Sequence, residues 1–234
     1  MSESVEMYLL TIYRLHLDGE DAGCVRLAQR MGVSAGSCTE MVKKLIERGL
    51  VERTQGKEFQ LTRAGLGMAL RVIRKHRLVE RLLTDHLKIP WDHAHEQACR
   101  LEHVLSDQVA DALEEFLGFP ETCPHGYPIP DRQGRLAVRE NRPLSECRPG
   151  ERVEVDRVAE DSGELLRYLE EMDLKPGREV FIEQVAPFEG PLLVQVGPRQ
   201  FPLSRRIAAK IAVRPKVAAR SSPAAAASPG RSDV

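Results

Sequence analysis

The chain has 234 residues, of which 42% are hydrophobic and 29% are charged, and its formal net charge is −1. This length allows more than one domain, and no run of residues approaches the roughly 18 apolar residues of a membrane helix. The acidic first ten residues and the five widely spaced cysteines argue against a secretory signal and a disulfide framework, so we expect a cytoplasmic protein with no membrane association and with reduced thiols.

The near-neutral total charge hides two blocks of opposite sign. Residues 24–81 contain 13 Lys and Arg against 5 Asp and Glu, a net charge of +8. Residues 82–160 contain 9 against 16, a net charge of −7. Surface charge also varies by chance, but a basic block that carries a recognisable motif is typical of a nucleic-acid surface attached to another domain.

Residues 4–62 predict the order helix, helix, turn, helix and hairpin. The first helix, over residues 4–18, has an apolar stripe formed by Val5, Tyr8, Leu9, Ile12 and Leu15. Two short helices follow, with Ser34 as the N-cap of the second and Gly49 as its end. Their predicted inner faces are Leu27, Ala28 and Met31 in the first, and Val42, Leu45 and Ile46 in the second. Residues 50–62 alternate like a hairpin around the turn QGK, which completes a winged helix-turn-helix.

The next segment predicts three more helices. Thr62 caps a long helix that runs to about Lys88, where Pro90 ends it. Another helix starts near Asp92, and Ser106 caps a further one. The apolar face of this last helix is formed by Val109, Leu113, Phe116 and Leu117.

The C-terminal half changes character. Residues 118–135 are rich in Pro and Gly and form either a linker or an ordered irregular loop. From Pro143, short alternating runs with one helix among them predict a small β-barrel. The final residues are a low-complexity segment that we expect to be disordered. The predicted fold is mainly α with a small β part, divided into residues 1–72, 73–130, 131–142, 143–214 and 215–234.

Seven side chains form a candidate metal-binding constellation. If residues 95–103 are helical, each residue turns by roughly 100°, so four potential donors share one side. These donors are His95, Cys99, Glu102 and His103. His76 and Glu80 share a face of the long helix, and Met7 lies on the first helix. A lone His or Cys is more often structural, and the Cys99 thiol or the Met7 thioether can simply pack in the hydrophobic core. Seven donors at these spacings on three predicted helices nevertheless favour a metal site.

Two neighbouring motifs leave other interpretations open. The run HEQAC differs from the zinc-protease pattern HEXXH only at its last position, and a metallohydrolase would use Glu96 as its base. Glu96 lies about 100° around the helix from His95, which disfavours that function. In the run CPHG, Cys123 and His125 offer two further donors, although a Pro-rich turn is the simpler interpretation.

Several runs resemble the iron-dependent repressor family, typified by the diphtheria toxin repressor. They are EMYLLTIYRL, KHRLVERLLTD, HEQACRLEHVLSD and CPHGYPIP, and the resemblance covers residues 4 to 130. The segment 143–214 is similar, more loosely, to the SH3-like domain of ferrous-transport-protein-A type. The resemblance implies an N-terminal winged helix-turn-helix domain over 1–72, a helical metal-binding and dimerisation domain over 73–130, a linker and an SH3-like β-barrel.

The resemblance also implies two metal sites between the DNA-binding and dimerisation domains. The ancillary site would contain His76, Glu80 and His95. The primary site, to which the backbone carbonyl of Cys99 can contribute, would contain Met7, Cys99, Glu102 and His103. Relatives also use a glutamate and a glutamine from the SH3-like domain, and alignment places Ser162 and Leu165 there. Neither is a good ligand, and the nearby carboxylates that could take their place as metal ligands are Asp161 and Glu164.

The second helix of the helix-turn-helix is expected to enter the major groove with its first turn. Its outward residues are Ser34, Gly36, Ser37, Thr39 and Glu40. Relatives commonly carry glutamine at the position of Glu40 and proline at that of Gly36. A carboxylate cannot donate to bases but accepts from a cytosine amine, so the base preference is left open. Phosphate contacts are expected from Lys43, Lys44 and Lys57, although a solvated basic face explains each lysine alone.

These features predict a metal-activated, homodimeric transcriptional repressor that binds a palindromic double-stranded DNA operator and controls metal-uptake or iron-homeostasis genes. The dimer is expected to form through the helices from about Arg81 to Leu117. Fe²⁺ is the expected activator, because the soft ligands Met7 and Cys99 stand where manganese-sensing relatives carry carboxylates; Mn²⁺, Co²⁺, Ni²⁺ or Zn²⁺ can substitute. The alternatives are a manganese-responsive regulator of the same fold, a winged-helix regulator of another ligand, and a metalloenzyme.

Overall fold

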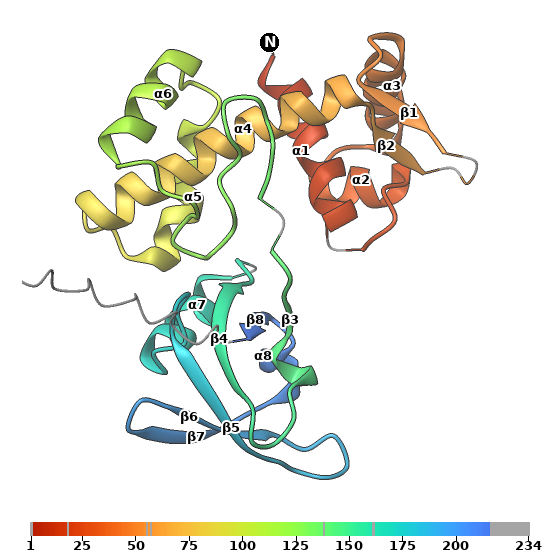
Figure 1. Cartoon of the computed structure of the whole chain (residues 1–234). Coiled ribbons are helices and arrows are strands. Elements are labelled where there is room, and N and C mark those ends of the chain that lie inside the picture. The colour runs from red at the N-terminus through yellow and green to blue at the C-terminus, as the bar shows by residue number, and fades with distance from the viewer. Residues whose placement is uncertain are drawn as a thin grey trace, which may run out of the picture.

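Figure 1 shows a computed structural model of the chain, with the helical part above and the β-rich part below. The structure describes residues 2–17, 19–54, 56, 58–137, 139–160 and 162–215. Lys57, Asp161 and nearly all of the predicted disordered tail, from residue 216 onward, lie outside the described residues. Within the described residues, no helix is both long enough and apolar enough to cross a membrane.

The N-terminal domain has the predicted helix-turn-helix and hairpin. Its elements are α1 (Glu3–Leu17), α2 (Cys24–Met31), α3 (Ala35–Glu47), β1 (Val51–Arg53) and β2 (Phe59–Leu61), with the two strands antiparallel. The side chain of Ser34 caps α3 by accepting from the Ser37 backbone N–H at 3.1 Å. One core prediction is wrong: Ile46 is 38% exposed, because the inner face of α3 is formed instead by Cys38, Val42 and Leu45.

The helical domain begins with α4 (Arg63–Arg81), which runs out of the DNA-binding domain (Figure 1). Thr62 caps it as predicted, accepting from the Gly65 N–H at 3.1 Å. The predicted continuation to Lys88 differs in detail. A π-helical turn, η1 (Leu82–His86), follows α4, and Lys88 has a φ of 57°, so the chain leaves the helix before Pro90.

Two shorter helices complete this domain, α5 (Trp91–Leu101) and α6 (Asp107–Phe116). The Ser106 side chain caps α6 as predicted, accepting from the Val109 N–H. The apolar face predicted for α6 is largely uncovered, with Val109 50% and Phe116 64% exposed. Because α5 ends at Leu101, Glu102 and His103 lie in the following turn rather than on the helix itself.

The C-terminal domain is an antiparallel six-stranded sheet with strand order β3-β8-β4-β5-β6-β7. Its elements are β3 (Arg142–Pro143), η2 (Leu144–Glu146), β4 (Arg152–Val158), α7 (Gly163–Glu171), β5 (Glu179–Val185), β6 (Leu192–Val196), β7 (Arg199–Leu203), α8 (Arg205–Ala208) and β8 (Ile211–Pro215). The four predicted runs are β4 to β7. The sequence pattern missed β3 and β8, which are short and pair with each other across almost seventy intervening residues.

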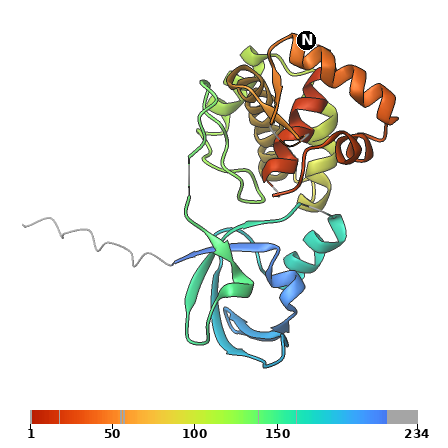
Figure 2. The same ribbon diagram turned by 90° about the vertical axis from the view of Figure 1, so that its right-hand side faces the viewer.

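The helical domain and the barrel share a packed interface, seen from the side in Figure 2. Trp91, the first residue of α5, is 7% exposed and belongs to the hydrophobic core of the barrel. Arg167 of α7 pairs with Asp92 at 2.8 Å. The Pro- and Gly-rich segment is an ordered irregular loop that packs on β4: a Cβ added to Gly126 would lie 2.0 Å from the carbonyl oxygen of Asp156. Residues that follow β4 are therefore held against the helices.

Candidate metal centres

The buried face of α4 carries two of the predicted donors. His76 is 4% exposed and Glu80 is 0% exposed, one helical turn apart. The Nε2 atom of His76 lies 3.0 Å from Glu80 Oε1 and 3.2 Å from Nδ1 of His95, which α5 presents from the opposite side. The spacing along α4 and the packing of α5 against it thus bring the three residues of the predicted ancillary site together.

A fourth ancillary donor comes from the barrel. Glu160, just after β4, has its Oε2 atom 3.0 Å from Nδ1 of His95. Its donor atom lies within 4.8 Å of those of His76, Glu80 and His95. These four residues are called the ancillary set below. Two imidazoles and two carboxylates are donors that suit a divalent transition metal.

The barrel residues suggested by alignment are corrected by this arrangement. Ser162 is the N-cap of α7, accepting from the Leu165 N–H at 3.2 Å, and Leu165 packs against the barrel core. Glu164 lies in the first turn of α7 and lines a different cavity. Among the barrel residues that the structure describes, the carboxylate that faces His95 is Glu160, two residues before Ser162. A strand end carries no helical periodicity, so the sequence offered only the residue type as a signal.

Three of the four predicted primary ligands meet where α1 touches the turn after α5. The Met7 Sδ atom lies 3.1 Å from Nε2 of His103, and Glu102 Oε1 lies 3.3 Å from the same nitrogen. Glu6, which the sequence analysis did not select as a ligand, places its Oε2 atom 2.7 Å from Nδ1 of His103. The turn thus draws thioether, carboxylate and imidazole donors from two domains to one point.

Cys99 and Glu102 connect this point to the ancillary set. The Cys99 thiol lies 3.7 Å from Nε2 of His95, and its sulfur groups with His76 and His95 within 4.8 Å. Glu102 Oε2 lies 2.6 Å from Nδ1 of His76 while its other oxygen faces His103. The structure therefore brings Met7, Glu102 and His103 together, and it directs the Cys99 thiol toward the ancillary histidines. The name primary set is kept for Met7, Cys99, Glu102 and His103.

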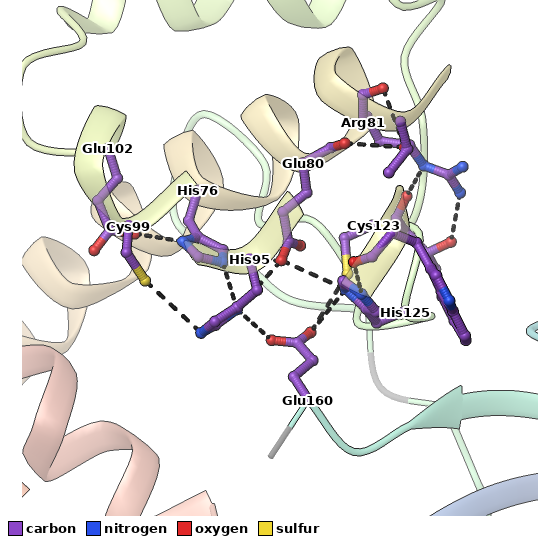
Figure 3. Close-up of polar contacts among 12 residues, drawn as sticks. His76, Glu80, Arg81, His95, Cys99, Glu102, Cys123, His125 and Glu160 are labelled. Carbon is purple, nitrogen blue, oxygen red and sulfur yellow. Dashed lines mark hydrogen bonds and ion pairs between the residues drawn. The ribbon is translucent and has the colours of Figure 1, made fainter. Parts of the chain in front are cut away.

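A third group of donors includes the loop residues that the sequence analysis interpreted as a turn. Cys123 and His125 are both 0% exposed, and with Glu80 and Glu160 they form a set whose donor atoms lie within 4.8 Å of one another. His125 Nε2 lies 3.0 Å from the Trp91 carbonyl oxygen, and its Nδ1 lies 3.4 Å from Glu80 Oε1 and 3.5 Å from Glu160 Oε1. Glu80 Oε2 has no hydrogen-bond partner among the described residues. Figure 3 shows donors of all three groups side by side: the row begins at Glu102 and ends at His125, and Glu160 lies below it. We call the third group the loop set.

The charges of the cluster stabilise one another. Burial lowers the pKa of His95, but contacts with Cys99 and with the carboxylates of Glu160 and Glu80 raise it to about 12. Burial also opposes ionisation of Glu80, yet the charge of His76 and hydrogen bonds from the imidazoles hold its pKa well below its usual range. Burial raises the pKa of the Cys99 thiol, and the two neighbouring imidazoles outweigh it, lowering the pKa to about 6. Thiolate and carboxylates are thus ready to bind a cation that displaces imidazole protons.

The surroundings of the donor cluster show how a cation can reach it and whether Glu96 can act as the base of a metallohydrolase. A cleft of about 290 Å³, lined among others by Tyr13 and Arg77, reaches His76, His95 and Glu160. Glu96, the base that a metallohydrolase would need, is 64% exposed and pairs with Arg100 at 2.5 Å. This pair lies on the outer side of α5, so the structure gives no support to a hydrolytic role for Glu96.

The DNA-contact residues predicted on α3 lie on one surface. Every candidate that the structure describes there is exposed, namely Ser34, Gly36, Ser37, Thr39, Glu40, Lys43 and Lys44. Cys38 and Val42 face the opposite way into the core. The small residues of the first turn leave the backbone accessible, which suits close approach to base edges.

Family models match three consecutive segments of the chain. Residues 1–58 match the iron dependent repressor N-terminal DNA binding domain. Residues 62–131 match the iron dependent repressor metal binding and dimerisation domain. Residues 142–215 match the FeoA domain. The three segments coincide with the winged helix-turn-helix, the helices that carry the donors, and the barrel.

Individual relatives agree with these matches. The chain is 41% identical over 128 residues to the iron-dependent repressor IdeR of Mycobacterium leprae, covering 55% of this chain and 56% of that protein. The chain therefore spans just over half the length of the curated relatives it matches. A solved manganese-dependent transcriptional repressor in complex with manganese is 31% identical, with a TM-score of 0.82 over 89% of this chain and 98% of that one. The manganese regulator SloR is 33% identical, with a TM-score of 0.73 over 92% and 100%.

Proposed function

The chain belongs to the iron-dependent repressor family, and we propose from this premise that it is a cytoplasmic, metal-activated repressor of metal-uptake or iron-homeostasis genes. The observation that carries the proposal is the contact between Met7 of α1 and His103, at 3.1 Å. The helix α1 packs against α2 and β2, so a cation held at this point would tie the DNA-binding domain to the helical domain. The cation would activate DNA binding to the extent that it binds the DNA-competent arrangement more tightly than the inactive arrangement.

The proposed active form is a homodimer on a palindromic double-stranded operator. Val109 and Phe116 on the apolar face of α6 are exposed, and so is Val104 in the preceding turn, so a single chain leaves these apolar side chains uncovered. A second copy covering this face would place two α3 helices for two half-sites. The exposed first turn of α3 would contact base edges, and Lys43 and Lys44 would contact phosphates, as would Lys57.

Fe²⁺ is the proposed physiological metal. Met7 supplies a soft sulfur donor beside His103 and Glu102, and Cys99 supplies a second one beside His95. This mixture of sulfur, nitrogen and oxygen donors suits Fe²⁺ and also Co²⁺, Ni²⁺ or Zn²⁺. A manganese-responsive regulator is the second candidate, since both solved relatives named above are described as manganese proteins. Mn²⁺ prefers oxygen donors, so the sulfur ligands favour iron.

DNA binding tests the proposal directly. Anaerobic selection from a random duplex library with Fe²⁺-loaded full-length protein should enrich a palindrome, and binding to that duplex should be lost in excess chelator and restored by added metal. Equal specific affinity with and without chelator would refute metal activation. Failure to enrich any sequence with any of the five divalent metals would refute the repressor function.

A paired substitution tests the choice of metal. In the variant carrying Met7→Asp and Cys99→Glu, oxygen replaces both sulfur donors, so activation should shift from Fe²⁺ toward Mn²⁺. Operator binding is measured against buffered free metal, without oxygen, for the wild type and the variant. If the wild type responds to Mn²⁺ at a lower free concentration than to Fe²⁺, the manganese alternative replaces the iron assignment.

A further inference from the structure

Two cysteines lie on facing parts of α2 and α3 inside the DNA-binding domain, away from the metal donors. Cys24 is the first residue of α2 and is partly exposed, and Cys38, on α3, is 0% exposed. The Cys38 Sγ atom lies 3.6 Å from the Cys24 carbonyl oxygen. The Cys24 Sγ atom lies 3.7 Å from the hydroxyl of Thr39, the neighbour of Cys38 on α3. The pair therefore spans the contact between the two helices of the helix-turn-helix.

The two thiols have different access to solvent. Burial raises the pKa of Cys38 to about 11, and the adjacent Cys24 thiol adds to this effect. Cys38 is therefore a sheltered, protonated thiol, and Cys24 is the member of the pair that a small reagent in solution can reach. The other three cysteines lie elsewhere, Cys99 and Cys123 among the metal donors and Cys147 in the barrel core.

We propose that Cys24 and Cys38 are a redox modification site at which a hydroperoxide forms a reversible disulfide. The Cys24 sulfur attacks the peroxide O–O bond, which gives a sulfenic acid and releases water or an alcohol. The Cys38 sulfur then displaces the hydroxyl group of that sulfenic acid, forming the S–S bond, and its proton leaves with the hydroxyl group as water. Two thiols are oxidised and one peroxide is reduced in the whole sequence.

The disulfide changes the surface that reads DNA. An S–S bond is about 2.05 Å long, much shorter than any contact between two thiols, so bond formation draws α3 against the start of α2. Thr39 follows Cys38 on α3 and moves with it, and its exposed side is a proposed base contact. Base recognition depends on hydrogen bonds with narrow distance limits. The oxidised protein should bind metal normally and bind its operator more weakly; this consequence rests on the repressor function proposed above.

Mass spectrometry tests bond formation without DNA. Full-length protein is treated with hydrogen peroxide, alkylated and digested with trypsin, which places Cys24 in residues 15–26 and Cys38 in residues 31–43. These two peptides should appear as one disulfide-linked species that dithiothreitol separates. It should be absent in Cys24→Ser and in Cys38→Val, which keeps an apolar side chain in the core. If Cys24 is instead alkylated or oxidised to a sulfinic acid with no linked species, the proposal is wrong.

Operator binding tests the consequence and separates it from oxidation of Cys99. Mn²⁺-loaded wild type, Cys24→Ser and Cys38→Val are compared before and after peroxide, on the selected duplex. The wild type should lose about tenfold in affinity, the value of roughly one base contact, and recover with dithiothreitol, while both variants keep theirs. An equal loss in all three proteins would assign the effect to Cys99 and overturn the proposed switch. Metal-independent binding by the reduced wild type would instead refute metal activation, and absent binding would refute the repressor function.

Discussion

The ancillary and primary sets differ in which parts of the chain they join. The ancillary set takes His76 and Glu80 from α4, His95 from α5 and Glu160 from the barrel. The primary set joins the turn after α5 to α1 through Met7 and His103. A cation at the first would hold the barrel on the helical domain, and a cation at the second would hold the DNA-binding domain on it. We therefore propose that activation depends mainly on the primary set.

The two sets are nevertheless connected by Glu102. One oxygen of this 1% exposed residue faces His76 and the other faces His103. A cation that recruits either oxygen reorients a carboxylate that the other set also uses. Coupling of this kind is reciprocal in binding free energy, so each metal should alter the affinity of the other.

The largest predicted effect comes from removing the imidazole that meets α1. His103→Ala should lower metal-dependent operator affinity by roughly 100-fold or more, because the cation loses the ligand beside Met7. His93→Ala is the matched control, since His93 lies on α5 with its side chain 59% exposed. Fluorescence anisotropy of a labelled operator across a metal titration measures both. If the two variants have equal metal-dependent operator affinity, His103 does not hold the activating metal, and activation cannot be assigned to the primary set.

A smaller effect is predicted at the barrel. Glu160→Gln keeps the size of the side chain but removes a charge, and should weaken metal binding at the ancillary set by roughly 10–100-fold. Operator affinity at saturating metal should stay near that of the wild type, because α1 is untouched. Glu164→Gln, a nearby carboxylate outside the set, should change neither quantity. Calorimetric metal titration together with operator binding checks this, and full loss of DNA binding in Glu160→Gln would contradict it.

The sequence predicted which side chains lie together on one helix for a physical reason. A helix fixes which residues share a face, so the proximity of His76 to Glu80 and of His95 to Cys99 was predictable from spacing. Glu102 and His103, which were expected on the same helix, lie in the turn after α5. The N-caps Ser34, Thr62 and Ser106 were likewise predictable, because each supplies an oxygen to an unpaired backbone N–H. These features depend on local geometry.

The remaining residues of the site depend on long-range packing. Glu160 reaches His95 only because the barrel docks on α5 through Trp91. His125 lies by Glu80 only because its loop folds back onto β4. Neither position has a periodic neighbour that would reveal it. The prediction that Ile46 lies in the core was wrong for a related reason. Spacing alone does not tell which edge of an apolar stripe the neighbouring helices cover.

The raised pKa values of the ancillary imidazoles predict a pH-dependent metal affinity. The pKa values of His76 and His95 are raised, that of His95 to about 12, so both imidazoles carry protons at neutral pH that a cation must displace. Metal affinity at the ancillary set should therefore fall as pH falls from 8 to 6, with release of roughly two protons per ion. Below the Cys99 pKa of about 6, protonation of this thiol should steepen the loss.

Proton release is measured directly by adding Mn²⁺ or Zn²⁺ to weakly buffered protein that contains a pH indicator. His95→Gln should release about one proton fewer, because it removes one of the two charged imidazoles. His93→Gln provides the matched control. Release that does not change in His95→Gln would show that this imidazole is not displaced by the metal.

The smallest effect uses the only tryptophan of the chain. The Trp91 ring stacks on His125, with centroids 5.3 Å apart and an interplanar angle of 21°, and the amino group of Lys175 lies 5.3 Å from its centre. A cation bound by the loop set would change the charge on His125 and with it the emission of Trp91. Fluorescence should therefore shift on metal addition in the wild type. His125→Phe keeps an aromatic ring beside Trp91 but cannot bind metal, so its emission should stay unchanged under the same titration. If the metal-induced change in Trp91 emission persists in His125→Phe and disappears in His103→Ala, Trp91 senses metal at the primary set. The loop set and the primary set would then act as one coupled unit.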